Sequence, residues 1–216
     1  MGTAKRAEIG NLLEKEQFSV YCMTETFHQN DGEAKCIHPQ YKWVGKARCD
    51  DSKKSGGGLG FLLHSGVTLI DDNVLKSGED ELERLWISVR LHNRKKSLML
   101  GLVYFPNDGV DIQKSENLTS ELIENLGSLK AMGYDCLLMG DFNGTIPAFR
   151  NPRKSSPNGD LLNQLIEISD VKILNCHDTC TGTFTWQRGN LKSVIDYALA
   201  TESLVNDLNL VTIDQL

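Results

Sequence analysis

Residues 136–143, with the sequence CLLMGDFN, decide the fold class of this chain. Four apolar residues in succession, followed by a sharp change to polar ones, are typical of a short strand that is covered on both faces. Gly140 allows a tight turn of the backbone, and Asp141 and Asn143 follow it at once. The stretch therefore predicts a buried strand that brings polar side chains to the edge of a rigid scaffold.

Working outward from this strand, amphipathic stripes predict helices over residues 4–16, over 115–132 with a stop at Gly133, and from residue 158 onward. Residues 84–92 alternate and predict a half-buried strand. Many strands with few helices indicate an α/β fold in which two sheets pack face to face, with helices outside, in a single domain over residues 1–216. Further strands are expected at residues 18–23, 41–45, 59–63, 98–104, 171–174, 183–187, 193–199 and 208–213.

Composition narrows the class of protein. The chain has 216 residues, of which 40% are hydrophobic and 24% charged, and its formal net charge is −6. These values argue against bulk disorder and against a passive, basic nucleic-acid binder, and they suit a metal-dependent enzyme. No apolar run is long enough for a membrane span, and the N-terminus lacks an apolar signal core. We expect an intracellular protein, nuclear or cytoplasmic and not secreted.

Three carboxylates stand at the ends of apolar strands or within them: Glu25, Asp141 and Asp196. If these strands are neighbours, the acids meet in one cleft, where they repel one another unless a cation lies among them. Oxygen ligands of this kind suit Mg²⁺ or Mn²⁺. The alternative is that each acid caps a turn independently. The segment at residues 140–143 is the sharpest element, because Asp141 could activate water and the Asn143 amide could bind a phosphoryl oxygen.

An ordered set of motifs resembles the endonuclease/exonuclease/phosphatase superfamily, which includes DNase I-like nucleases and apurinic endonucleases. The set is Thr24-Glu25-Thr26, Tyr104-Phe105-Pro106, Gly140-Asp141-Phe142-Asn143 and Ser193-Val194-Ile195-Asp196-Tyr197. Asn158-Gly159 and the run from Gly182 to Trp186 narrow the resemblance to the apurinic-type endonuclease domains of non-LTR retrotransposons. In a full-length protein of that kind, a reverse transcriptase is expected downstream.

The resemblance implies a four-layered α/β sandwich that hydrolyses a phosphodiester with Mg²⁺ (or Mn²⁺), most simply by nicking DNA. Glu25 would hold the metal, and Tyr104 would donate a hydrogen bond to the scissile phosphate. Asp141 would orient and deprotonate the attacking water, while Asn143 would bind a phosphate oxygen in the transition state. Asp196 would orient a catalytic histidine.

Two features of the family pattern are missing from the sequence. The family has an asparagine on a strand before its first helix, which begins here near Ala4, and it ends with a Ser-Asp-His motif on a last strand. We therefore expect an incomplete domain, truncated at both ends, with weak activity or none. The histidines that are present lie outside the matching context: His28, His38, His64, His92 and His177.

Substrate contacts and alternative functions complete the expectations. Trp186 could support DNA with its ring or could be buried in the sandwich, and Arg150, which follows the 140–143 segment, is a candidate for phosphate contact. One alternative is a phosphoesterase of the same family that acts on a small phosphoester. The other is a non-catalytic remnant of the fold that binds nucleic acid or protein.

Overall fold

The computed structural model describes residues 2–27, 37–48, 57–71, 75, 81–92, 94–147, 155–207 and 211–213. The chain forms two compact units, residues 1–102 and residues 103–216. The two are considered one at a time below. The expectation of a single domain over residues 1–216 stays a prediction.

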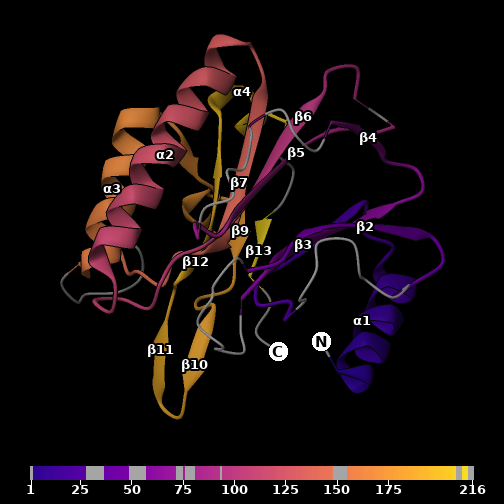
Figure 1. The fold of residues 1–216 in the computed structure, drawn as a ribbon, viewed down its shortest axis with the longest axis horizontal. Coiled ribbons are helices and arrows are strands. Elements are labelled where there is room, and N and C mark those ends of the chain that lie inside the picture. The colour runs from indigo at the N-terminus through magenta and orange to yellow at the C-terminus, as the bar shows by residue number, and fades with distance from the viewer. Residues whose placement is uncertain are drawn as a thin grey trace. The chain divides into compact units, whose positions relative to one another are not determined.

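Unit 1 is built around helix α1 (Thr3–Glu16) and a three-stranded antiparallel sheet. The sheet has the order β1 (Val20–Met23), β3 (Leu59–His64), β2 (Tyr41–Lys46). Ile9 and Leu13 on one side of α1 pack with Tyr41 and Leu62 of the sheet, as the apolar stripe of the helix predicted (Figure 1). This small core fixes the strand that leads into Glu25.

Strand β5 (Arg84–Arg90) pairs antiparallel with β4 (Thr68–Asp71), and the prediction that β5 is half-buried was wrong. Trp86 and Ser88, on the face expected to meet solvent, are 1% and 0% exposed. The cause is packing over the second face of the strand, which an alternation of residue types cannot reveal. The chain then passes from unit 1 into unit 2 within β6 (Leu98–Tyr104).

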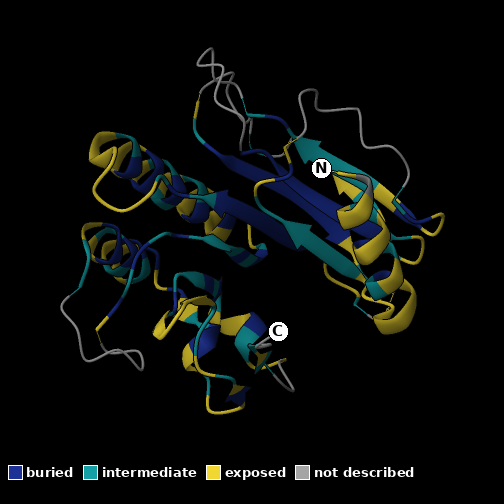
Figure 2. Cartoon of the chain, turned by 90° about the horizontal axis from the view of Figure 1, so that it is seen from below, coloured by how far each residue is buried: buried dark blue, intermediate teal, exposed yellow. Residues whose placement is uncertain are grey.

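Unit 2 contains two long helices, α2 (Ile112–Ala131) and α3 (Pro157–Ser169), which pack against each other (Figure 1). Its strands β7 (Asp135–Asp141), β12 (Asp196–Ala200) and β8 (Lys172–Ile173) are neighbours in that order. Burial follows the predicted stripes, so the strands are largely covered while the helices keep exposed outer faces (Figure 2). The buried helix leucines are Leu118, Leu122, Leu126, Leu129, Leu162 and Leu165.

Local signals set the ends of these helices. The Asp111 carboxylate accepts the N–H of Lys114 at 3.1 Å where α2 begins, and Gly133, with φ of 78°, follows its end. Helix α3 begins after Ser156, whose hydroxyl accepts the N–H of Gly159 at 3.3 Å, and Pro157 occupies its first turn.

The short elements differ most from expectation. The strand expected at 171–174 is cut to β8 by a 3₁₀ turn (Leu174–Cys176), and the run at 193–199 is divided between β11 (Leu191–Ser193) and β12. Strand β10 (Trp186–Arg188) forms a hairpin with β11, and β9 (Cys180–Thr181) pairs parallel with β13 (Val211–Thr212). The sequence analysis did not predict β4, β9 or helix α4 (Glu202–Val205), because two to four residues carry no usable period.

Among the described residues, no helix combines the length and the apolar content that crossing a bilayer requires.

Two glycine substitutions test how tightly the backbone is packed before the 140–143 segment turns. Gly140 has φ of 151°, and a Cβ there would collide with the backbone oxygen of Val103. We expect Gly140→Ala to lower the free energy of unfolding by about 3 kcal/mol, because neither the φ angle nor the neighbouring backbone can adjust.

The matched control is Gly127→Ala, at an exposed position in the middle of α2 with no atom within 4 Å of the new Cβ. There alanine should raise the free energy of unfolding by about 0.5–1 kcal/mol. Denaturant unfolding of both variants provides the measurement. Equal effects at the two positions would contradict the close approach of residues 140 and 103.

Candidate active site

Asp141 and Asp196 lie directly opposite each other in the antiparallel pair formed by β7 and β12. Residues paired in this way project to the same face of a sheet, with Cβ atoms about 4.5–5.5 Å apart. The structure therefore brings together two of the three carboxylates singled out in the sequence. A pair of like charges at this spacing is destabilising unless a proton, a hydrogen bond or a cation compensates it.

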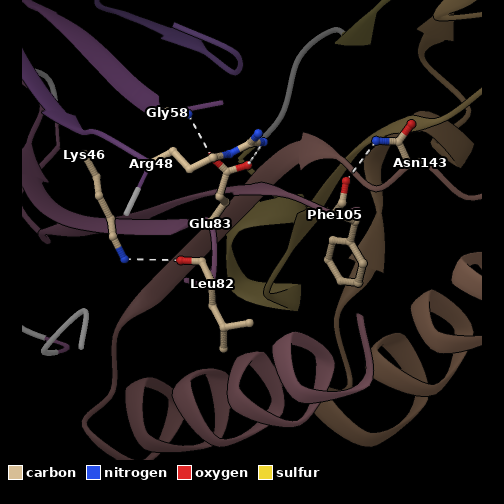
Figure 3. Close-up of polar contacts among 7 residues, drawn as sticks. All are labelled: Lys46, Arg48, Gly58, Leu82, Glu83, Phe105 and Asn143. Carbon is tan, nitrogen blue, oxygen red and sulfur yellow. Dashed lines mark hydrogen bonds and ion pairs between the residues drawn. The ribbon is translucent and has the colours of Figure 1, made fainter. Parts of the chain in front are cut away.

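The loop after β7 turns back on Asp141. Its Oδ1 accepts the N–H of Asn143 at 2.8 Å, which holds Asn143 in the left-handed region with φ of 45°. The Asn143 amide nitrogen in turn donates to the carbonyl of Phe105 at 2.9 Å (Figure 3). The orientation of the amide is therefore set by a neighbouring backbone group, with one of its two hydrogens used.

Phe142 anchors this loop between the two polar residues. Its ring is fully buried, stacks on Phe105 with centroids 5.1 Å apart, and meets Tyr197 edge to face at 5.9 Å. The N–H of Phe142 also donates to the carbonyl of Ile195 at 2.9 Å. Because a buried aromatic ring stands between them, Asp141 and Asn143 are held in fixed positions at the end of β7.

The first turn of α3 supports the same loop. Asn158 is 1% exposed and donates through Nδ2 to the carbonyl oxygens of Pro106 (2.9 Å) and Asn143 (3.3 Å). Its own N–H donates to the carboxylate of Asp108 at 2.9 Å. Asn158-Gly159 stood out in the sequence only as part of a motif, with no role predicted for Asn158. The structure shows that its amide fastens α3 to the two loops that follow β6 and β7.

Asp196 is held by a second set of side chains that sequence reasoning missed. The Thr185 hydroxyl accepts the N–H groups of Ile195 (3.0 Å) and Asp196 (3.1 Å). The Asn175 side chain donates through Nδ2 to the carbonyl of Asp196 (3.1 Å), and its Oδ1 accepts the N–H of Ala198 (2.9 Å). Burial raises the pKa of the Asp196 carboxyl, and a hydrogen bond with the Thr185 side chain partly offsets that shift.

The remaining predicted residues of unit 2 have different surroundings. Tyr104 is the last residue of β6 and is half-buried. Trp186 begins the β10–β11 hairpin with 38% of its surface exposed, which does not fit burial in the sandwich. The alternative, that its ring supports DNA, stays a prediction. Arg150 lies outside the described residues.

Glu25 belongs to unit 1, where it follows β1 in an exposed position with φ of 52°. The next N–H groups, of Thr26 and Phe27, donate to the carbonyls of Gly58 (3.1 Å) and Gly57 (2.9 Å). Among the described residues, no three His, Cys, Asp or Glu side chains form a group that could hold a metal ion. A single exposed carboxylate still fits Mg²⁺, which proteins often bind through one or two carboxylates, with waters and substrate phosphates as the other ligands.

Comparison with known proteins identifies a family for the chain. The family described as endonuclease–reverse transcriptase matches residues 98–215. No curated protein matches the chain by sequence.

Solved structures match over most of the chain. The apurinic (AP) endonuclease of Leishmania major has a TM-score of 0.72 at 14% identity, over 94% of this chain and 75% of that one. The endonuclease domain of TRAS1, a telomere-specific non-LTR retrotransposon, gives 0.66 at 14% identity, with 95% and 83% covered. A mannosyl-6-phosphatase of Bacteroides thetaiotaomicron gives 0.64 at 15% identity, with 93% and 77% covered. At these identities the structures establish the fold alone, and they confirm the predicted α/β sandwich. The family match over residues 98–215 confirms the resemblance that the motifs indicated.

The raised pKa of Asp196 predicts a pH-dependent effect of Asp196→Asn on stability. A carboxyl with a folded pKa above its unfolded value of about 3.9 stabilises the fold while protonated, and this contribution is lost as pH rises through the folded pKa. Asparagine does not ionise, so the variant avoids the loss. We expect the melting temperature of Asp196→Asn, relative to wild type, to increase from pH 3.5 to pH 7 in EDTA. A difference that does not change with pH would contradict the burial of this carboxylate.

Proposed function

The chain belongs to the endonuclease–reverse transcriptase family, and on that premise we propose that it is a Mg²⁺-dependent phosphodiester hydrolase that nicks DNA, of retrotransposon origin. The observation that carries the proposal is the 141–143 loop, where a buried phenylalanine holds a carboxylate and an amide at the end of β7. A DNA substrate would place its action inside the cell, in the nucleus or the cytoplasm.

Asp141 acts as the general base in this proposal. Its carboxylate accepts a proton from a water molecule whose oxygen forms a bond to phosphorus. The P–O bond to the sugar breaks, and the leaving oxygen takes up a proton from solvent. The bond from the Asn143 N–H to Oδ1 fixes the rotamer of the carboxylate, so little freedom is lost when water is bound.

Asn143 and Tyr104 bind the phosphate. The remaining amide hydrogen of Asn143 and the Tyr104 hydroxyl are donors for phosphoryl oxygens, whose negative charge increases as water attacks. Donors fixed by backbone contacts need not reorganise during the reaction, and the Phe105 carbonyl supplies such a contact to Asn143. Asp196, opposite Asp141 in the strand pair, is proposed to orient a catalytic histidine, as the family pattern implies.

Glu25 would hold the metal. Its exposed carboxylate is a hard oxygen ligand, and the strained turn in which it stands is typical of functional positions. When bound, Mg²⁺ (or Mn²⁺) supplies positive charge to the phosphate and stabilises the leaving oxygen.

The β10–β11 hairpin supplies a surface for DNA. It projects from the rest of unit 2 in Figure 1 and carries exposed Trp186 and Arg188. Lys192 lies 4.1 Å from the centre of the Phe184 ring. Cations beside aromatic rings on an exposed hairpin suit a ligand that offers phosphates and base faces. Arg150 is proposed as a further phosphate contact.

Nicking of supercoiled plasmid tests the catalytic proposal. In line with the weak activity expected from the sequence, the chain should convert supercoiled to open-circular DNA slowly in Mg²⁺, and EDTA should stop the reaction. We expect Asp141→Asn to lower the rate by at least about 100-fold, because a neutral carboxamide is not basic enough to accept a proton from water. The matched control is Asp170→Asn, at an exposed acid in a left-handed position after α3 that asparagine tolerates well. Its rate should equal that of wild type.

The outcomes separate the alternatives. Hydrolysis of small phosphoesters without plasmid nicking would favour a phosphoesterase of the same family. Folded protein that binds plasmid but hydrolyses neither substrate would favour a non-catalytic remnant. Equal rates for Asp141→Asn and wild type would remove Asp141 from the mechanism.

A binding measurement tests the hairpin. Trp186→Ala should weaken binding to a short duplex that contains a single-stranded gap by roughly fivefold or more, because a ring that stacks on an unpaired base contributes about 1–3 kcal/mol. The plot of log binding constant against log salt concentration has a negative slope, and Arg188→Ala should make it shallower by about 0.9, the value for one phosphate contact. Fluorescence anisotropy at several salt concentrations measures both, with Lys130→Ala on α2 as the control. Loss of affinity in the control alone would place the DNA elsewhere.

A further inference from the structure

Unit 1 contains a buried carboxylate that the proposed mechanism does not use. Glu83 lies just before β5 and is 6% exposed. Its Oε1 accepts hydrogen bonds from the N–H of Gly58 (2.8 Å) and from Nε of Arg48 (3.0 Å), and its Oε2 accepts one from Nη2 of Arg48 (2.7 Å) (Figure 3). Two parallel bonds between a guanidinium and a carboxylate fix both side chains in one plane.

The ion pair packs directly on a pair of glycines. Gly57 and Gly58 have φ angles of 77° and 88°, which other residues rarely adopt. A Cβ on Gly57 would collide with Nε of Arg48 and with Oε1 of Glu83. A Cβ on Gly58 would lie 2.6 Å from the Thr26 hydroxyl oxygen. The glycines are therefore enclosed by the ion pair on one side and by Thr26 on the other.

These glycines hold the turn that presents Glu25. Their carbonyls accept the N–H groups of Phe27 (2.9 Å) and Thr26 (3.1 Å). Glu25 and Phe27 both have left-handed φ angles, 52° and 57°, which cost free energy in residues with a side chain. Such a turn persists only where its surroundings fix it, and the Gly57–Gly58 backbone is the partner that two of its N–H groups contact.

We propose that the Glu83–Arg48 ion pair is a positioning device for the metal ligand Glu25, acting through Gly57 and Gly58. The inference rests on the proposed function, in which the Glu25 carboxylate holds Mg²⁺ or Mn²⁺. Glu83 touches neither metal nor substrate. It fixes the Gly57–Gly58 backbone, to which the N–H groups of residues 26 and 27 are hydrogen-bonded. In this way it fixes the direction of the Glu25 side chain.

The surroundings of Glu83 make this support hard to replace. The small cavity beside it, lined by Arg48 and Gly58 among others, has no room for a water molecule. Removal of the carboxylate would take from the Gly58 N–H its acceptor and from the Arg48 guanidinium its partner. The glycine pair would then shift, and the strained turn would relax with it.

Direct Mn²⁺ binding, without DNA, tests the inference. The signal of free Mn²⁺ in electron paramagnetic resonance gives a dissociation constant for each folded variant. We expect Glu83→Ala to raise that constant about tenfold or more, the usual effect of removing a group that orients a metal ligand. Glu83→Gln keeps an oxygen for the Gly58 N–H and should recover part of the affinity. Gly57→Ala should resemble Glu83→Ala, because its methyl group displaces the ion pair.

Two controls separate positioning from general loss of stability. Asp135→Ala removes another buried carboxylate, which accepts the Ser203 hydroxyl at 2.6 Å in unit 2. Lys46→Met removes a hydrogen bond of 3.2 Å to the carbonyl of Leu82, next to Glu83, and keeps the ion pair (Figure 3). Both should bind Mn²⁺ as wild type does, even where circular dichroism shows a lower melting temperature.

Every other result contradicts a specific part of the proposal: the positioning role of Glu83 or the metal-binding role of Glu25. Wild-type affinity in Glu83→Ala and Glu83→Gln, with binding lost in Glu25→Gln, would overturn the positioning role and leave the metal proposal intact. Wild-type affinity in Glu25→Gln would remove Glu25 as the metal ligand, and this inference with it. Affinity lost equally in Asp135→Ala would show that the effect of Glu83 is on stability alone. If Glu83→Ala does not fold, Glu83→Gln and Gly57→Ala decide the matter.

Discussion

Two carboxylates facing each other across one strand pair are the constraint on which the arrangement of unit 2 around its candidate site depends. Asp141 and Asp196 occupy opposite positions of β7 and β12, where like charges repel. Burial favours the neutral form of Asp196, and the N–H of Asn143 donates to Asp141. The same ladder places Phe142 in the core, so the groups that stabilise the fold also hold the proposed base and phosphate donor.

Both units present their polar residues in the same way. Asn143 in unit 2 and Glu25 in unit 1 each adopt a left-handed backbone conformation just beyond a strand. This conformation costs free energy that glycine would not lose. Each conformation is held by contacts with a second segment: the Phe105 carbonyl and Asn158 in one case, the Gly57–Gly58 backbone in the other. The left-handed backbone at these positions fixes each side chain in a direction that a relaxed turn would not give it.

Cavities are a poor guide to function in this molecule. An open groove of about 620 Å³ in unit 2 runs beside β8 and the 3₁₀ turn, and none of the predicted site residues lines it. A polymeric phosphodiester needs an accessible surface with fixed donors and a general base, whereas enclosed pockets suit small ligands. The proposal of a DNA substrate therefore rests on the 141–143 loop and the exposed hairpin.

The sequence by itself determined the α/β class, the long helices and the principal strands, because their periods of 3.6 and 2 and their caps are local properties. It also singled out Asp141, Asn143 and Asp196, since polar residues after apolar runs are visible in one dimension. The tertiary structure alone decided that Asp141 faces Asp196, that both faces of β5 are covered, and that Thr185, Asn175 and Asn158 support the site. The Glu83–Arg48 pair joins residues 35 positions apart, and no local pattern encodes a contact made by the folding of separate segments.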